Sequence, residues 1–138
     1  MLKIVLDTNI LLICLPTKSK YRPIFDNLMA GTFQLVISNE ILSEYTEILG
    51  RKTNSVIANN VAELLLTLKN VRKSEVYYRW NLIKADADDN KSADCAVAAN
   101  ADFIVSNDRH FGELKKTDFP KINVINSENF LLLLQNNE

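Results

Sequence analysis

Short, continuously apolar segments alternate with longer segments of helical periodicity, and this alternation restricts the fold of the chain more than any other feature. Leu2–Leu6 and Phe103–Ser106 are apolar along most of their length rather than at every second residue. That pattern is typical of strands buried on both faces. Further strands are predicted at Phe33–Ile37, Val71–Tyr78 and Ile122–Ile125. Strands that alternate with helices predict an α/β fold, in which helices cover both faces of a central parallel sheet.

The residues that flank the apolar segments predict where the helices begin and end. Pro23 suits the first turn of a helix, and Gly31 suits its C-terminal cap. Ser38 is the expected N-cap of the next helix, which we expect to end at Gly50. The other predicted helical segments are a stretch after a turn at Thr8–Asn9, residues 55–68, residues 91–100, a short turn at 111–114, and residues 127–134 capped by Ser127.

Length and composition indicate one globular domain over residues 1–138, with 47% hydrophobic and 24% charged residues. The net charge is -1, so the chain is not a polycation built for nonspecific duplex binding. No apolar run approaches the roughly 20 residues that a membrane span needs, and Asp7 interrupts the N-terminal apolar stretch. We therefore expect a cytoplasmic protein with no membrane association, in which Cys14 and Cys95 are buried and reduced.

Carboxylates follow two of the predicted strands at the point where each strand ends. Asp7 comes directly after Leu2–Leu6, and Asp108 lies two residues after Phe103–Ser106. Either residue alone could simply cap a turn. Ligands of open parallel sheets, however, bind beyond the carboxyl ends of the strands. The placement of both acids therefore indicates a functional site.

Further carboxylates lie on two of the predicted helices. Glu44 is at the edge of the inward stripe of its helix, whereas Glu40 and Glu47 suit a solvated acidic face. Acids also crowd the start of the Ala-rich helix beyond what capping needs, namely Asp86, Asp88 and Asp89, with Asp94 one turn later. Taken together with the strand-end acids, these residues suggest a single site.

A cluster of carboxylates favours metal-dependent phosphodiester cleavage. Mg²⁺ and Mn²⁺ take oxygen ligands, and one or two such ions can activate water and neutralise phosphate charge. His110 is the only histidine, which argues against a zinc site built on histidines. The chain has neither a Gly-rich phosphate loop nor a nucleophile elbow.

Two alternatives remain at this point. The first is an aspartyl phosphotransfer domain with Asp7 as the acceptor, although the expected second aspartate and the late lysine are missing. The second is a binding module that kept the fold and lost catalysis.

Four segments, in order along the chain, resemble the motifs of PIN-domain ribonucleases. They are Val5–Asn9, Ser38–Glu44, Asp86–Ala96 and Ala101–Phe111. The third segment has the form found in a bacterial branch of toxins from toxin–antitoxin systems. The resemblance implies a three-layer α/β/α sandwich with a parallel sheet. It also implies Mg²⁺- or Mn²⁺-dependent cleavage of single-stranded RNA, a small antitoxin partner and a homodimer.

Site residues follow from the same resemblance, motif by motif. The catalytic and metal-binding acids it implies are Asp7, Glu44, Asp89 and Asp108, with Asp86, Asp88 and Asp94 as alternatives for the third position. Asn9 matches the family's polar residue near the first acid, and Ser106 keeps the hydroxyl of the commoner Thr. Asn100 stands where Gly is common, which is tolerable because Asn accepts the left-handed conformation.

Substrate contacts are less marked in the sequence. Arg109, next to Asp108, is the expected phosphate contact, although most basic residues of such a chain are solvated surface. Tyr77, Tyr78 and Trp80 either stack on RNA bases or pack within the protein.

Overall fold

The computed structural model describes residues 1–83, 89–116 and 120–136. Its strands are β1 (Lys3–Leu6), β2 (Gln34–Ile37), β3 (Val71–Lys73), β4 (Phe103–Val105) and β5 (Val124–Ile125). Its helices are α1 (Thr8–Cys14), α2 (Arg22–Ala30), α3 (Asn39–Lys52), α4 (Ser55–Thr67), α5 (Asn90–Ala99), the 3₁₀ helix η1 (Arg109–Lys116) and α6 (Ser127–Asn136).

The strands form one parallel sheet in the order β3-β2-β1-β4-β5. Ile4 lies opposite Phe103 and Leu6 opposite Val105, so β1 and β4 are neighbours at the centre of the sheet. This confirms the predicted fold class. The chain adds β2 and β3 on one side of β1 and then returns to add β4 and β5 on the other. Such a reversal of strand order is where open α/β sheets place their sites.

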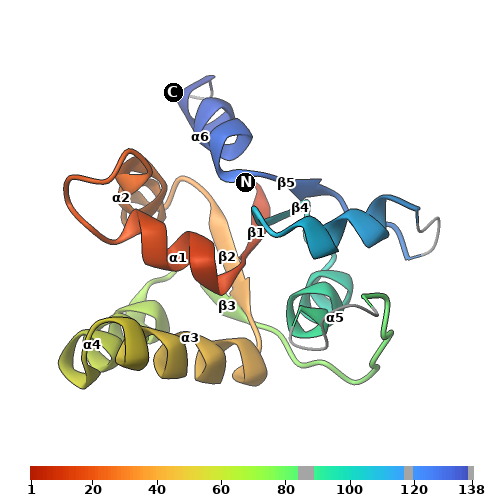
Figure 1. Ribbon diagram of the computed structural model, residues 1–138, viewed down its shortest axis with the longest axis horizontal. Helices are drawn as coiled ribbons and strands as arrows, with labels where there is room; N and C mark the ends of the chain where they lie inside the picture. Colours follow the sequence, from red (N-terminus) through yellow and green to blue (C-terminus); the bar gives the residue numbers. More distant parts are fainter. Residues whose placement is uncertain (84–88, 117–119, 137–138) are drawn as a thin grey trace.

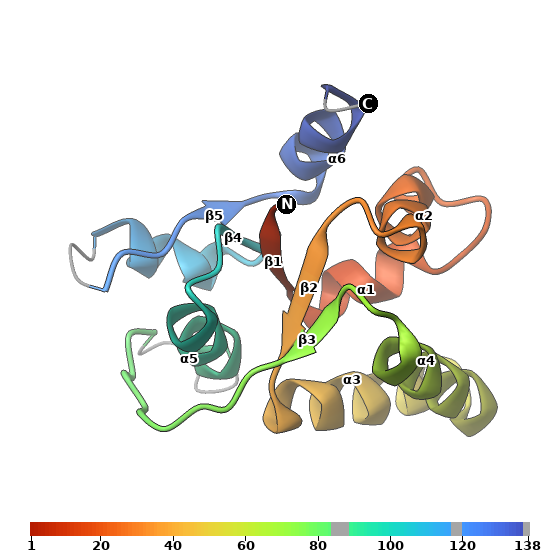
Figure 2. The ribbon, with the colours of Figure 1, turned by 180° about the vertical axis from the view of Figure 1, so that it is seen from behind.

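Helices cover both faces of the sheet (Figures 1 and 2). Helix α5 packs against β1, β2 and β4, whereas α1 packs with α2 and α3. The side chains of Ile4, Val5 and Leu6 are all fully buried, although they point alternately to the two faces. Burial on both faces explains the continuously apolar character of this segment.

The predicted third strand is shorter than expected, because β3 ends at Lys73 rather than Tyr78. Its neighbour β2 ends at Ile37, whose carbonyl accepts a hydrogen bond from the Ser74 N–H at 2.7 Å. Beyond that bond no strand among the described residues continues the ladder, and residues 74–83 form neither helix nor strand. β5 is likewise limited to two residues, which pair with Ile104 and Val105.

Three predicted helix ends are wrong. α1 begins at Thr8 with no intervening turn. Gly50 lies inside α3, which continues to Lys52, and an ideal Cβ on Gly50 would lie 3.9 Å from the Ala58 Cβ of α4. Gly50 therefore occupies the contact between two helices instead of a cap. At α6, the Asn126 side chain accepts the Asn129 N–H at 2.8 Å, so Asn126 is the N-cap in place of Ser127.

Other predicted caps are confirmed. Ser38 Oγ accepts a hydrogen bond from the Ile41 N–H at 3.1 Å. Gly31 and Asn100 end their helices in the left-handed conformation, with φ of 79° and 52°. Both cysteines are free and buried, and burial raises the pKa of the Cys14 and Cys95 thiols to about 12.

Alanine substitutions at two glycines test these helix ends. Gly50→Ala should stabilise the fold by roughly 0.5–1 kcal/mol, because Gly is a poor residue for a helix interior. Gly31→Ala should destabilise it, since its φ of 79° is strained for a residue with a side chain. Chemical denaturation measures the free energy of unfolding of each variant relative to wild type. A Gly50→Ala variant less stable than wild type would show that α3 and α4 cannot accommodate the methyl group.

Candidate active site

The Ser106 hydroxyl joins the two acids that follow β1 and β4. Its Oγ donates a hydrogen bond to Asp7 Oδ2 at 2.8 Å and accepts one from the Asp108 N–H at 3.0 Å. The Asp7 N–H in turn donates to the Val105 carbonyl at 3.0 Å, which continues the pairing of β1 with β4. One hydroxyl therefore positions both the Asp7 carboxylate and the loop that carries Asp108.

Asp7 lies in an environment that disfavours its ionised form. Its residue is only 7% exposed. Burial raises the pKa of its carboxyl above the ordinary 3.8, the Ser106 hydrogen bond opposes the rise, and the charges of Glu44 and Asp108 add to it. The ionised carboxylate is therefore stabilised by whatever positive charge is bound nearby.

Glu44 reaches the same end of the sheet from α3. Its Oε2 accepts a hydrogen bond from Thr8 Oγ1 at 2.5 Å, and its Oε1 lies 3.7 Å from Lys91 Nζ of α5. The neighbouring Tyr45 is buried and donates its hydroxyl to the Leu6 carbonyl at 2.5 Å. This bond attaches α3 to the end of β1 and sets Glu44 beside the first residues of α1.

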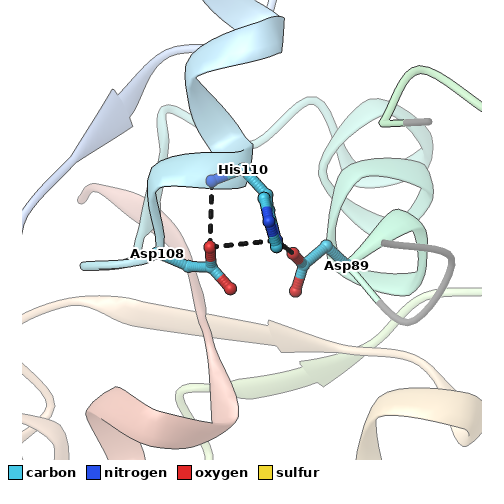
Figure 3. A group of neighbouring side chains, drawn as sticks. All are labelled: Asp89, Asp108 and His110. Carbon is cyan, nitrogen blue, oxygen red and sulfur yellow. Dashed lines mark hydrogen bonds and ion pairs between the residues drawn. The ribbon is translucent and has the colours of Figure 1, made fainter. Parts of the chain in front are cut away.

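Asp89 and Asp108 form a compact group with His110 (Figure 3). One potential ligand atom from each residue lies within 4.8 Å of the other two. His110 Nδ1 is 3.3 Å from Asp108 Oδ1 and 3.6 Å from Asp89 Oδ2. Figure 3 shows the imidazole ring between a carboxylate from the start of α5 and one from the loop after β4. The fold thus brings Asp89 to the strand end that carries Asp108.

Sequence reasoning missed His110 and Lys91 as members of this site. In the sequence, His110 is evidence only against a histidine-based zinc centre. Its backbone N–H donates to Asp108 Oδ1 at 2.9 Å, and this local turn keeps the two side chains together. The Asp-x-His spacing directly after a strand was the available signal. Lys91 had a weaker signal, its position two residues after Asp89.

Asp94 lies apart from this group. Its Oδ1 accepts the Trp80 N–H at 3.0 Å, and burial raises the pKa of its carboxyl. Because residues turn by about 100° each along a helix, Asp94 faces a different direction from Asp89. Its contact holds residues 74–83 against α5. Asp86 and Asp88 lie outside the described residues.

The two remaining predicted residues are exposed. Asn9 is exposed on the first turn of α1. Arg109 is exposed at the start of η1 and lines a surface depression together with Ser106, Asn107 and Asp108.

Two asparagines tie neighbouring segments to the site. Asn90 donates its Nδ2 to the Ile83 carbonyl and accepts the Ile83 N–H on Oδ1, both at 2.9 Å. Asn107 donates its Nδ2 to Ser127 Oγ and accepts the Ser127 N–H, also at 2.9 Å. These paired bonds hold residues 74–83 to the start of α5 and hold α6 to the loop after β4.

The donors of this site fit a divalent cation. Carboxylate oxygens are the ligands that Mg²⁺ and Mn²⁺ take in proteins. Glu44 and Asp108 each raise the pKa of Asp7 through their negative charge, so a bound cation would relieve this repulsion. In the described group of Asp89, Asp108 and His110, one potential ligand atom from each residue lies within 4.8 Å of the others, which is close enough to hold one ion.

Comparison with known proteins identifies the family. Residues 3–110 match the PIN domain family, so the chain belongs to it. PIN domains are generally nucleases that use divalent metal ions. None of the curated proteins matches the chain by sequence.

Solved structures share the fold. VapBC2 from Rickettsia felis, bound to a DNA fragment from its promoter, has a TM-score of 0.63 at 16% identity, covering 91% of this chain and 98% of that chain. DNA-bound VapBC from Salmonella typhimurium has a TM-score of 0.60 at 19% identity, covering 92% and 99%. The PIN domain endonuclease Utp24 has a TM-score of 0.54 at 19% identity, covering 90% and 84%.

Membrane insertion of a helix has no support in the part of the chain that the structure describes. Each helix there is too short, or too polar, to cross a bilayer.

Asp7→Asn tests the electrostatics of the metal-free site. Since the folded-state pKa of Asp7 lies above 3.8, the ionised carboxylate destabilises the folded state at neutral pH. The penalty fades as the pH falls through the raised pKa toward 3.8. Asp7→Asn should therefore raise the free energy of unfolding at neutral pH, with a gain that shrinks on acidification.

Chemical denaturation in the presence of a chelator, at several pH values, measures this gain. Asp26→Asn is the control, because Asp26 is exposed and pairs with Arg22 within α2. A metal-free Asp7→Asn protein less stable than wild type at neutral pH would contradict the expectation.

Proposed function

We propose that this protein is an endoribonuclease that cleaves phosphodiester bonds of single-stranded RNA with Mg²⁺ or Mn²⁺. The observation that carries the proposal is the convergence of acids from separate elements at one end of the sheet, namely Asp7, Glu44, Asp89 and Asp108. Membership of a family of nucleases supports it. When bound, the cation supplies positive charge to the phosphate and lowers the pKa of water beside it.

The elements that carry the proposed ligands determine how firmly each ligand is positioned. Asp7 and Asp108 follow strands, and Ser106 restrains both, so they are the most rigidly placed ligands in this proposal. Asp89 and Glu44 complete the site from α5 and α3. Thr8 orients the Glu44 carboxylate through its hydroxyl. Such preorganisation matters because misplacement of reacting groups slows catalysis steeply.

In this proposal Arg109 binds a phosphate of the RNA strand. Its exposed side chain lines the depression that also includes Asp108. An arginine there can donate two parallel hydrogen bonds to a phosphate of the bound strand. In this proposal the acids and their cation bind the phosphate that is cleaved, and Arg109 binds an adjacent phosphate of the same RNA strand.

A single-stranded substrate is supported by exposed aromatic side chains near the site. Tyr77 and Tyr78 are 88% and 64% exposed, and the Tyr78 ring lies 4.6 Å from Trp80, edge to face. Adjoining surface depressions lead from Glu44 past Glu40 to Tyr77. Exposed aromatic rings stack with unpaired bases. The choice of RNA over DNA rests on the resemblance to PIN-domain ribonucleases.

We also propose that residues 1–138 act as one nuclease domain, as a homodimer, with a small antitoxin protein as partner. The resemblance to toxins of toxin–antitoxin systems and the fold shared with VapBC structures support the partner. Large apolar side chains on α2, α4 and α6 are available for such contacts, namely Met29, Val56, Ile57, Leu66 and Leu132.

Amide variants of the strand-end acids test the proposed activity. Asp7→Asn and Asp108→Asn keep the side-chain shape but remove its charge. Each should slow cleavage of single-stranded RNA in Mn²⁺ on the order of 10²-fold or more, by analogy with the loss of one preorganised electrostatic group. Glu47→Gln is the matched control, since Glu47 is exposed and pairs only locally with Arg51. Glu40 is a poorer control than the sequence suggested, because it binds Arg79 through both carboxylate oxygens.

The same assay decides the register of the third acid. Asp89→Asn should be inactive, whereas Asp94→Asn should retain activity because Asp94 contacts Trp80 outside the cluster. The reverse result would assign the third position to Asp94. Wild-type rates for both Asp7→Asn and Asp108→Asn, in folded protein, would refute the carboxylate site as a whole.

Alanine substitution of the exposed tyrosines tests the substrate path. Base stacking contributes about 1–3 kcal/mol per base, so Tyr77→Ala or Tyr78→Ala should raise KM for single-stranded RNA by roughly tenfold. The value of kcat should change little, because the hydroxyl of Tyr77 bonds to Glu75 rather than to one of the four acids of the candidate active site. Phenylalanine variants keep the ring and should behave like wild type. Equal KM values for the alanine variants and wild type would place the RNA elsewhere.

A further inference from the structure

We propose that the imidazole of His110 is itself a ligand of the cation at this site and makes the site prefer Mn²⁺ to Mg²⁺. The inference rests on the proposed function, because it concerns the cation that Asp89 and Asp108 would hold. It adds a nitrogen donor to a site that the sequence predicts to contain oxygen donors alone.

Spacing of the donor atoms is the first support. Ligands that bind a small divalent cation at about 2.1 Å, in octahedral geometry, lie about 3 Å from their neighbours. His110 Nδ1 lies 3.3 Å from Asp108 Oδ1 and 3.6 Å from Asp89 Oδ2. Small movements of the side chains would therefore place all three donors around one ion. Figure 3 shows the imidazole between the two carboxylates, with dashed lines that join it to both.

Local backbone geometry is the second support. The His110 N–H donates to Asp108 Oδ1 at 2.9 Å, in a turn that fixes the spacing of the two residues. η1 starts at Arg109, so His110 is part of a helical element rather than a free loop. The imidazole therefore starts from a backbone already placed beside Asp108, which reduces the entropy that binding an ion must overcome.

Donor chemistry determines the expected selectivity. Mg²⁺ favours oxygen ligands and retains its water molecules. Imidazole suits first-row transition ions such as Fe²⁺, Ni²⁺ and Zn²⁺, and Mn²⁺ is the member of that series with the lowest affinity for nitrogen and oxygen donors. Mn²⁺ accepts carboxylates as readily as Mg²⁺ does, so the carboxylates alone discriminate weakly between the two. Replacing one oxygen donor with the His110 nitrogen should shift the preference toward Mn²⁺.

The same distances also suit a different role, in which a protonated His110 is a counter-ion for the two acids. The two roles predict opposite effects of removing the imidazole. A ligand contributes to Mn²⁺ binding, so its loss weakens that binding. A counter-ion competes with the metal for the carboxylates, so its loss strengthens the binding of both Mn²⁺ and Mg²⁺.

The test measures metal binding by the full chain, without substrate. Calorimetric titration with Mn²⁺ and with Mg²⁺ compares wild type with His110→Ala and with Lys121→Ala, a control at an exposed position. Pulsed electron paramagnetic resonance of the Mn²⁺-loaded wild type then reports directly on a coordinated nitrogen. This spectroscopic measurement needs no variant, so it remains decisive even if His110→Ala fails to fold.

We expect nitrogen coupling in the wild-type spectrum, and tighter binding of Mn²⁺ than of Mg²⁺. His110→Ala should lose the coupling and weaken Mn²⁺ binding by at least about tenfold, since even the partners of metal ligands contribute that much. Its effect on Mg²⁺ should be smaller. Tight Mn²⁺ binding without nitrogen coupling would overturn the inference and leave the proposed function intact. Failure of wild type to bind either ion would overturn both.

Discussion

Parallel pairing between β1 and β4 is the contact on which the candidate active site depends. Leu6 lies opposite Val105, and the Asp7 N–H extends the ladder by one further bond to the Val105 carbonyl. Two adjacent strands therefore end at the same level, with Asp7 after one and Ser106 after the other. The strand order reverses at this point, so the connections leave on opposite faces of the sheet and residues from α1, α3, α5 and η1 meet beyond it.

The cluster of negative charges is tolerated because the acids have compensating contacts. Ser106 donates to Asp7, Thr8 donates to Glu44, and His110 lies beside Asp89 and Asp108. These contacts do not cancel the cost of burial, since the pKa of Asp7 is still raised. Carboxylates with perturbed pKa values are concentrated at functional sites and are uncommon elsewhere in a protein. The repulsion between the carboxylates of the metal-free site would be relieved by a bound cation, which is the physical basis of the proposed cation affinity.

Features that depend on local sequence were predictable, and those that depend on a partner segment were not. Ser38 caps α3 because its hydroxyl reaches an N–H three residues away, a contact that needs no other part of the chain. β3 stops at Lys73 because β2 stops at Ile37, which no pattern within residues 71–78 records. Gly50 looked like a helix end, yet it lies inside α3 at the contact with Ala58 of α4.

The sequence by itself determined the fold class and the two acids that follow strands, because burial on both faces leaves a continuous apolar segment and the residues after it lie beyond the strand ends. Only the tertiary structure separated Asp89 from Asp94, since both lie along the same helical segment and the direction each faces depends on how α5 packs. It also revealed His110 beside Asp89 and Asp108. His110 contacts Asp108 within its own segment, but its proximity to Asp89 arises only when α5 folds against the central strands.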